Sequence, residues 1–109
     1  MLYLLSDSEP KFQELCQTEV FRAQCTAADE VLFIKSALYG RMKIGKCVQT
    51  DYGHVGCNAD VMQHTDRRCS GKRKCQIPIP DPVLDKVKSN CPKEFKLYLQ
   101  IFYECMQGK

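Results

Sequence analysis

Eight cysteines in a chain of 109 residues constrain the fold more than any other feature. They are spread over nearly the whole sequence, at Cys16, Cys25, Cys47, Cys57, Cys69, Cys75, Cys91 and Cys105. A domain this small leaves much of its surface in water and is commonly stabilised by cross-links. An even number of scattered cysteines is typical of a disulfide framework formed in an oxidising compartment. The sequence therefore predicts one domain with four disulfides and an extracellular location, either secreted or in the ectodomain of a membrane protein.

A structural zinc site is the alternative use of cysteine, and it requires ligands in close pairs such as C-x2–4-C. The closest cysteines, Cys69 and Cys75, are separated by five residues, and the histidines His54 and His64 supply no second pair. No acidic cluster has the spacing of a calcium loop. We therefore expect no metal and no cofactor.

The sequence contains no group that indicates catalysis. All eight cysteines are expected in disulfides, so none is left as a nucleophile. The two histidines have no visible partners, and no pair of carboxylates can be assigned a catalytic separation from the sequence. We expect a protein that is not an enzyme.

The start of the chain carries little information about the fold. No apolar run approaches the roughly 18 residues of a membrane-spanning helix, so we expect no direct membrane insertion. The opening "MLYLL" is too short for a signal-peptide core, and we expect an excised mature domain in which Met1 is an addition. Residues 1–13 show no periodicity and are interpreted as a lead-in segment, with the domain spanning 14–107.

Alternating apolar and polar residues predict four strands. They are expected within residues 19–25, 30–40, 75–80 and 96–105. The two prolines of the third segment, Pro78 and Pro80, would confine it to the edge of a sheet. Cys25 and Cys105 each end an apolar strand face, which favours a bridge between those two faces.

One main helix is predicted over residues 58–71. Asn58 would be its N-cap, Arg67 and Arg68 fall in the last turn, and Gly71 lies where the helix would end. The residues on its apolar face are Val61, Met62, Thr65 and Cys69. A shorter helical turn is expected within 81–91. The predicted fold class is a small disulfide-rich α+β domain with antiparallel strands, one main helix and long cross-linked loops.

Together with the cysteines, three motifs resemble the SUEL-type lectin domain, a rhamnose- or galactose-binding module of egg lectins and latrophilin-type adhesion receptors. The first motif is A-x-YGR after the second strand, at residues 37–41. The second is C-x-G-x-x-x-C after the helix, at 69–75, and the third is the final Tyr98-Leu99 with Tyr103-Glu104-Cys105. The resemblance covers about residues 14–105 and includes all eight cysteine positions. It implies the pairs Cys16–Cys47, Cys25–Cys105, Cys57–Cys91 and Cys69–Cys75.

The resemblance also implies a sugar pocket made of four pieces, of which this chain matches one. Tyr39, Gly40 and Arg41 match the family's Tyr-Gly-Arg turn. The family's acid after the first cysteine is Gln17 here, and its Asp-Pro before the seventh cysteine is Ser89-Asn90. The glycine after that cysteine is replaced by Lys93, and the family lysine falls on Leu97, with Lys96 one residue early.

The candidate sugar-binding residues are therefore Tyr39, Gly40, Arg41 and Lys96. A structural role is an open alternative for the first three. In that role the tyrosine packs against the end of the sheet, the glycine takes a positive φ, and the arginine bonds nearby carbonyl groups.

A second candidate site is basic. Arg67, Arg68, Lys72, Arg73 and Lys74 place five positive charges in eight residues. Such clusters hold sulfates by charge-assisted hydrogen bonds, so heparan sulfate is a candidate ligand, although most charge runs are solvated surface.

We therefore predict a non-catalytic extracellular carbohydrate-binding module with a partly degraded monosaccharide pocket. The expected partners are glycans or glycoproteins, and not nucleic acid. Two alternatives stay open: recognition of an extracellular protein by a cell-adhesion or guidance receptor, and binding of glycosaminoglycan through residues 67–74.

Overall fold

The computed structural model describes residues 10–49, 55–89, 91–92 and 95–108. They form, in chain order, β1 (Lys11–Leu15), β2 (Val20–Gln24), β3 (Glu30–Arg41), β4 (Cys57–Asp60), α2 (Met62–Cys69), β5 (Lys74–Pro78), α3 (Pro82–Asp85) and β6 (Tyr98–Gln107). Within these residues neither helix is long and apolar enough to span a membrane. This small, mostly antiparallel, disulfide-rich α+β domain confirms the predicted fold class.

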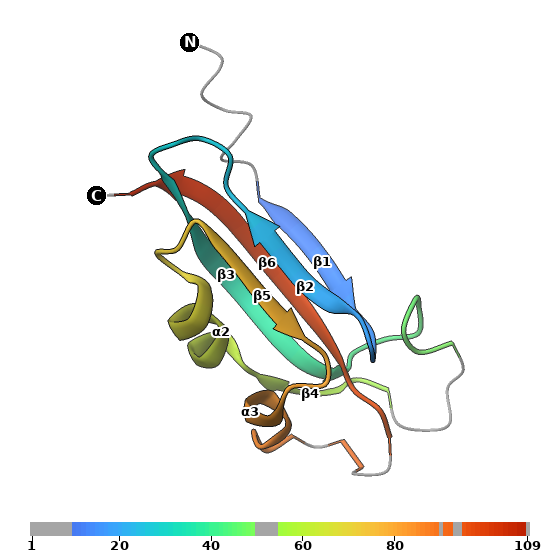
Figure 1. Ribbon diagram of the computed structural model, residues 1–109. Coiled ribbons are helices and arrows are strands. Elements are labelled where there is room, and N and C mark those ends of the chain that lie inside the picture. Colours follow the sequence, from blue (N-terminus) through green and yellow to red (C-terminus); the bar gives the residue numbers. More distant parts are fainter. Residues whose placement is uncertain (1–9, 50–54, 90, 93–94, 109) are drawn as a thin grey trace.

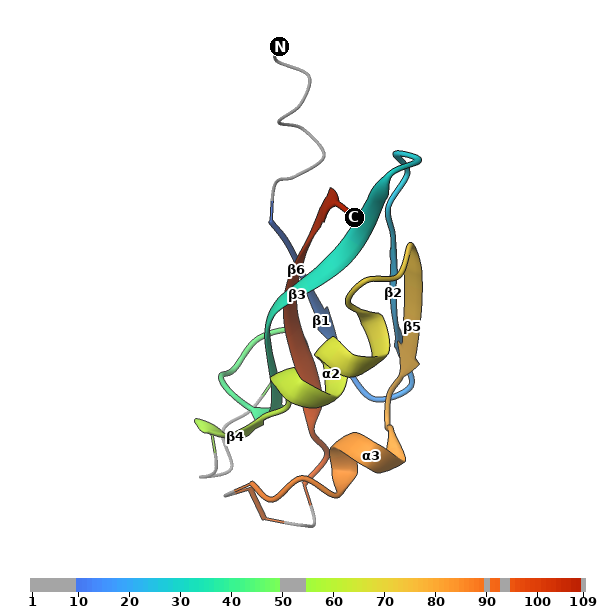
Figure 2. The same ribbon diagram turned by 90° about the vertical axis from the view of Figure 1, so that its left-hand side faces the viewer.

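The strands form two antiparallel sheets that face each other (Figures 1 and 2). The larger sheet has the order β1-β6-β3-β4, and the smaller pairs β2 with β5. Helix α2 packs against β3 and β5, and Figure 2 shows it along one side of the space between the sheets. Helix α3 lies at the end of the molecule where β5 ends.

The core lies between the two sheets and is made by the inward faces of the alternating strands. Phe21 on β2 and Tyr103 on β6 meet edge to face, with ring centroids 5.5 Å apart. The Cys25–Cys105 disulfide joins the same two strands nearby, and both cysteines are buried. The alternation in residues 19–25 and 96–105 therefore predicted both the strands and the bridge between them, because inward side chains share one core.

All four disulfides expected from the resemblance are present, and the described residues contain no free cysteine. Cys16–Cys47 and Cys57–Cys91 attach the loops to the sheet, and Cys69–Cys75 joins α2 to β5. The predicted strands within 30–40 and 75–80 and the short helical turn within 81–91 are also confirmed.

The lead-in assigned to residues 1–13 ends too late, because β1 already begins at Lys11. Phe12 lies opposite Phe102 of β6, with ring centroids 4.5 Å apart. Gln13 donates a hydrogen bond from Nε2 to the Tyr103 hydroxyl group, 3.0 Å away. Sequence periodicity missed this strand because it is short, lies at a sheet edge and buries only Leu15.

The start of the main helix was predicted wrongly. Asn58 is not an N-cap but a residue of β4, and α2 begins at Met62. The side chain of Asp60 accepts a hydrogen bond from the Met62 backbone N–H, 2.9 Å away. Arg67 and Arg68 do lie in the last turn, as predicted, and Gly71 follows the helix with a φ of +86°.

Gly40 allows residues 57–60 to pair with β3 as a strand. Tyr39, Gly40 and Arg41 are not a turn, as the sequence suggested, but the last residues of β3. Gly40 pairs with Asn58 of β4, and its φ is not positive. A Cβ atom on Gly40 would lie against the Cys57 carbonyl oxygen and 2.5 Å from Asn58 Cα. Glycine is therefore needed here for the close approach of β4.

Replacing Gly40 by alanine is expected to destabilise the domain by about 1–3 kcal/mol, because β4 must move away from β3 to admit the methyl group. Equilibrium unfolding in guanidinium chloride measures this loss. Gly45→Ala is the matched control, since a Cβ atom at Gly45 meets nothing within 4 Å. Equal stability of the two variants would show that β4 does not depend on the missing side chain.

Candidate functional site

A cleft of about 630 Å³ opens at the end of the molecule that holds α3. Its walls come from the β1–β2 connection and the end of β3. The residues just before and just after Cys91, which is bonded to Cys57, complete the lining. The polar and aromatic residues that matter most for its chemistry are Gln17, Tyr39, Asp85, Ser89, Phe95 and Lys96. The cleft therefore gathers residues that are far apart in the sequence.

Tyr39 forms part of the inner wall of the cleft. Its side chain is almost fully buried, and its hydroxyl group donates a hydrogen bond to Asp85 Oδ1, 2.7 Å away. Burial, followed by the hydrogen bond to Asp85, raises the pKa of the tyrosine well above its ordinary value. Tyr39 therefore stays protonated and holds the Asp85 carboxylate at the cleft.

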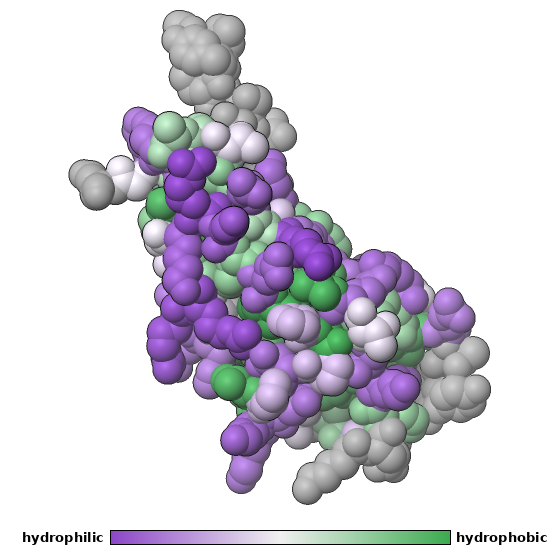
Figure 3. Space-filling model, viewed as in Figure 1, coloured by the Kyte–Doolittle hydropathy of each residue, from purple (hydrophilic) through white to green (hydrophobic). Residues whose placement is uncertain are grey.

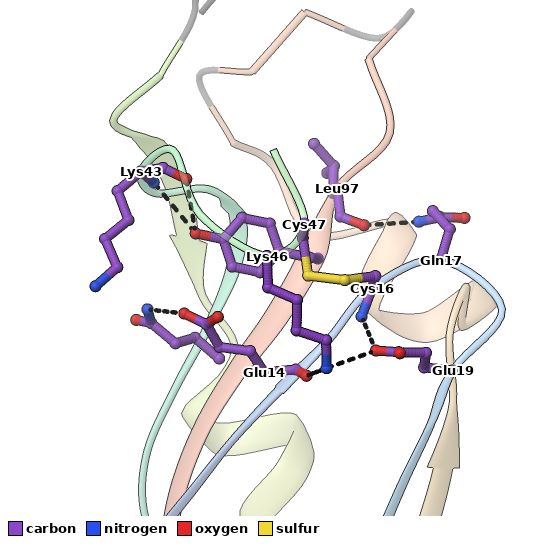
Figure 4. Close-up of a disulfide and its surroundings, with 10 residues drawn as sticks. Glu14, Cys16, Gln17, Glu19, Lys43, Lys46, Cys47 and Leu97 are labelled. Carbon is purple, nitrogen blue, oxygen red and sulfur yellow. Dashed lines mark hydrogen bonds and ion pairs between the residues drawn. A yellow bond between two sulfur atoms is a disulfide. The ribbon is translucent and has the colours of Figure 1, made fainter. Parts of the chain in front are cut away.

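Gln17 links the β1–β2 connection to the start of β6 (Figure 4). Its Nε2 donates a hydrogen bond to the Leu97 carbonyl oxygen, 2.7 Å away. This is the position at which the resemblance implied an acid. A carboxylate cannot donate to a carbonyl oxygen, so the amide makes a contact here that an acid could not make.

The Cys16–Cys47 disulfide supports this corner of the cleft, as Figure 4 shows. The Cys16 backbone N–H donates to Glu19 Oε1 at 2.8 Å, and Lys46 forms an ion pair with the same oxygen at 3.1 Å. Lys46 also donates to the Glu14 carbonyl oxygen. These contacts hold Cys16 and Glu19, which lie on either side of Gln17 in the β1–β2 connection.

Gly40 and Arg41 are not among the residues that line the cleft. The Arg41 guanidinium group lies over the ring of Phe95, 4.5 Å from its centroid, in a cation–π contact. Phe95 does line the cleft. Arg41 thus acts on the cleft through Phe95, while Tyr39 is the one residue of the Tyr-Gly-Arg motif that faces it.

The positions singled out by the resemblance are brought together, although their residue types differ from the family pattern. Gln17, Ser89, Lys96 and Leu97 all line the cleft with Tyr39. Lys96 is exposed at its rim. Asn90 and Lys93 lie outside the described residues, as does His54.

Sequence reasoning missed Asp85 and Phe95. Asp85 ends α3, whose N-cap Asp81 accepts hydrogen bonds from the backbone N–H groups of Val83 and Leu84. An Asp-Pro pair followed by a second aspartate could have signalled a short capped helix with Asp85 on its last turn. No local signal shows that Phe95 meets Arg41, because that contact spans more than fifty residues of the chain.

The basic segment comprises the last turn of α2 and the turn that leads into β5, and none of its residues lines the cleft. Two of its five members are engaged with the protein: Arg68 pairs with Asp81 at 2.9 Å, and Arg73 donates to the Ala28 and Cys25 carbonyl oxygens. Arg67, Lys72 and Lys74 are exposed. Figure 3 shows hydrophilic residues gathered along the side of the molecule formed by α2 and the turn after it.

The described residues contain no group of three or more side chains that could hold a metal ion. His64 is half-buried on α2, away from the lining of the cleft. The chemistry available at the cleft is therefore hydrogen bonding, charge and contact with an aromatic surface.

The two sheets, four disulfides and polar cleft with an aromatic wall define a small disulfide-bonded recognition domain. A comparison with protein families matches residues 23–105 to the D-galactoside/L-rhamnose binding SUEL lectin domain. The chain belongs to this family, which confirms the resemblance seen in its motifs. A search of curated proteins found no match.

Membership of the family makes the chain a lectin-type module, and such domains generally bind carbohydrate and are typically non-catalytic. Its four disulfides are typical of the extracellular environment.

The Glu19 contacts predict a pH dependence of stability. The hydrogen bond from Cys16 and then the one from Lys46 lower the pKa of Glu19 below its ordinary value. The ionised form therefore stabilises the fold above the ordinary glutamate pKa of about 4.3. This contribution is lost as the pH falls through the lower pKa of the folded state.

Glu19→Gln is expected to be less stable than the wild type at pH 7, and the difference should disappear towards pH 2. Thermal unfolding followed between pH 7 and pH 2 tests this. Parallel stability curves for the two proteins across that range would contradict the role of the ionised carboxylate.

Proposed function

We propose that the domain is a non-catalytic extracellular lectin that binds galactose- or rhamnose-type sugars in the cleft between Tyr39, Ser89 and Phe95. The observation that carries this proposal is the position of the cleft. It gathers at least one residue from each of the four pieces that the family's sugar pocket implies: Gln17, Tyr39, Ser89 and Leu97. Neither a metal nor a cofactor is required.

The chemistry of the cleft suits a monosaccharide. A sugar ring presents hydroxyl groups at its edge and C–H groups on its faces, so its site needs a few polar groups and an apolar surface. Gln17, Asp85 and Ser89 supply amide, carboxylate and hydroxyl groups. Phe95 supplies an aromatic surface, held in place by Arg41.

Replacing Phe95 by alanine tests the cleft as the sugar site. We expect the affinity for methyl β-D-galactopyranoside or methyl α-L-rhamnopyranoside to fall about three- to tenfold, as is usual for the loss of one aromatic contact. Titration calorimetry or NMR shift titration measures the change. Phe33→Ala is the control, because Phe33 is an exposed phenylalanine of β3 that does not line the cleft. Equal binding by both variants would contradict this location.

Glycosaminoglycan binding through the basic segment is a second candidate function. Its support is the ordered backbone beneath the exposed charges of Arg67, Lys72 and Lys74. The Leu32 N–H donates to the Lys72 carbonyl oxygen at 2.7 Å, and the Cys25 N–H donates to the Arg73 carbonyl oxygen at 2.8 Å. A pre-ordered turn loses little conformational entropy when sulfate groups bind to it.

The variant Arg67→Gln/Lys72→Gln/Lys74→Gln is expected to elute from immobilised heparin at lower salt than the wild type. Each exposed charge contributes about two- to fivefold in affinity. Lys11→Gln, which removes an exposed lysine on β1, should have a much smaller effect. Unchanged elution of the triple variant would eliminate this second function.

Protein recognition, the remaining alternative, would use a different surface. The outward residues Phe12, Phe33, Phe102 and Met106 of β1, β3 and β6 are exposed. None of them lines the cleft. A protein ligand bound by these strands would leave the sugar site free.

A further inference from the structure

The charged residues that line the cleft are mostly positive. Lys86, Lys88 and Lys96 line it, and Asp85 is the only acid that does so among the described residues. Asp85 accepts the hydrogen bond from Tyr39. Over residues 85–97 the sequence contains four lysines and two acids, which gives a net charge of +2.

The three cleft lysines are not neutralised by the described part of the protein. None of them takes part in an ion pair with another described residue, and all three are exposed. A concave surface with charges of one sign raises the local concentration of ions of the opposite sign. The ammonium groups are therefore available to an anionic ligand.

Two acidic positions of the family pattern hold neutral residues in this chain. The family places an acid after the first cysteine, but this chain has Gln17 there, and the Gln17 amide is fixed on the Leu97 carbonyl oxygen. Ser89, which lines the same cleft, is also neutral. The change from acid to amide removes repulsion at the position where an anionic substituent would otherwise meet a carboxylate.

The remaining surface of the cleft suits the ring of a sugar and not a free inorganic ion. Phe95, Pro92 and Leu97 line it with apolar atoms. Such a surface gains from contact with the C–H face of a ring but gains nothing from a bare sulfate.

We propose that the cleft recognises an acidic monosaccharide unit, a galactose-type ring that carries a sulfate ester or a carboxylate. The ring contacts Phe95, and the anionic group lies among Lys86, Lys88 and Lys96. This proposal rests on the proposed function, since it assigns the ligand class of the same cleft. It places acidic-sugar recognition in the cleft, whose lining includes no residue of the basic segment 67–74.

The test compares the affinities of four small probes by titration calorimetry. These are methyl β-D-galactopyranoside, its 3-sulfate, its 6-sulfate, and the corresponding methyl galactosiduronate. A comparison of the sulfated rings with the carboxylated ring shows which anionic group, sulfate ester or carboxylate, the cleft prefers. At low ionic strength we expect at least one anionic probe to bind about tenfold more tightly than the neutral ring, and the advantage to shrink at about 0.5 M salt.

The variant Lys86→Gln/Lys88→Gln should lose most of that advantage while it keeps the affinity for the neutral galactoside. The matched control is Lys72→Gln/Lys74→Gln, which removes the same charge from exposed residues that do not line the cleft and should bind the small probes as the wild type does. Thermal unfolding of both variants shows that the fold is retained.

Four results would overturn the proposal. Equal affinity for neutral and anionic rings would do so and would leave the proposed lectin function standing. A charge preference that survives in the cleft variant, or sodium sulfate alone binding as tightly as the sulfated sugar, would also do so. If none of the four rings binds, the inference fails, and the proposed sugar site fails with it when methyl α-L-rhamnopyranoside does not bind either.

Discussion

The contact between the inner faces of β2 and β6 is the constraint on which the rest of the structure depends. Phe21 and Tyr103 meet edge to face there, and the Cys25–Cys105 disulfide closes a loop of 80 residues nearby. In the chain-entropy description such a loop destabilises the unfolded state by about 4–5 kcal/mol. With β6 fixed against β2, the start of β6 is carried to the end of the domain where the cleft opens.

Gly40 contributes to the wall of the cleft indirectly, through the position of β4. Because it has no side chain, β4 can lie against β3, and Cys57 then pairs in register with Arg41. From that position Cys57 forms the disulfide with Cys91, which lines the cleft. The Tyr-Gly-Arg motif therefore builds the site in three ways: Tyr39 faces the cleft, Gly40 brings β4 close, and Arg41 supports Phe95.

The sequence predicted the features that depend on local alternation or on the spacing of cysteines. The inward faces of residues 19–25 and 96–105 were visible because every second residue is apolar. The start of α2 could not be predicted in this way. Asn58 and Asp60 have the chemistry of helix caps, but they lie in β4, which can pair with β3 because Gly40, almost twenty residues earlier, has no side chain.

The candidate site could be predicted only in part, for a similar reason. The resemblance placed Gln17, Tyr39, Ser89 and Lys96 at or next to positions of the family's sugar pocket, and all four line the cleft. Asp85 and Phe95 could not be found without the tertiary structure, because their roles come from Tyr39 and Arg41 across the fold. The positive φ expected at Gly40 was wrong because a strand neighbour, not a turn, requires the glycine.

At Gln17 the departure from the family pattern replaces one kind of contact with another and does not simply remove part of the site. A carboxylate at this position would face the Leu97 carbonyl oxygen without a proton to donate, whereas the amide donates to it at 2.7 Å. The substitution thus adds a link between the β1–β2 connection and β6 while it removes a negative charge from one wall. The family lysine before the final strand is Leu97 here, while Lys86, Lys88 and Lys96 line the cleft. The neutral amide at position 17 and these three lysines both favour a positive electrostatic potential in the cleft, which is the potential that the proposed acidic sugar requires.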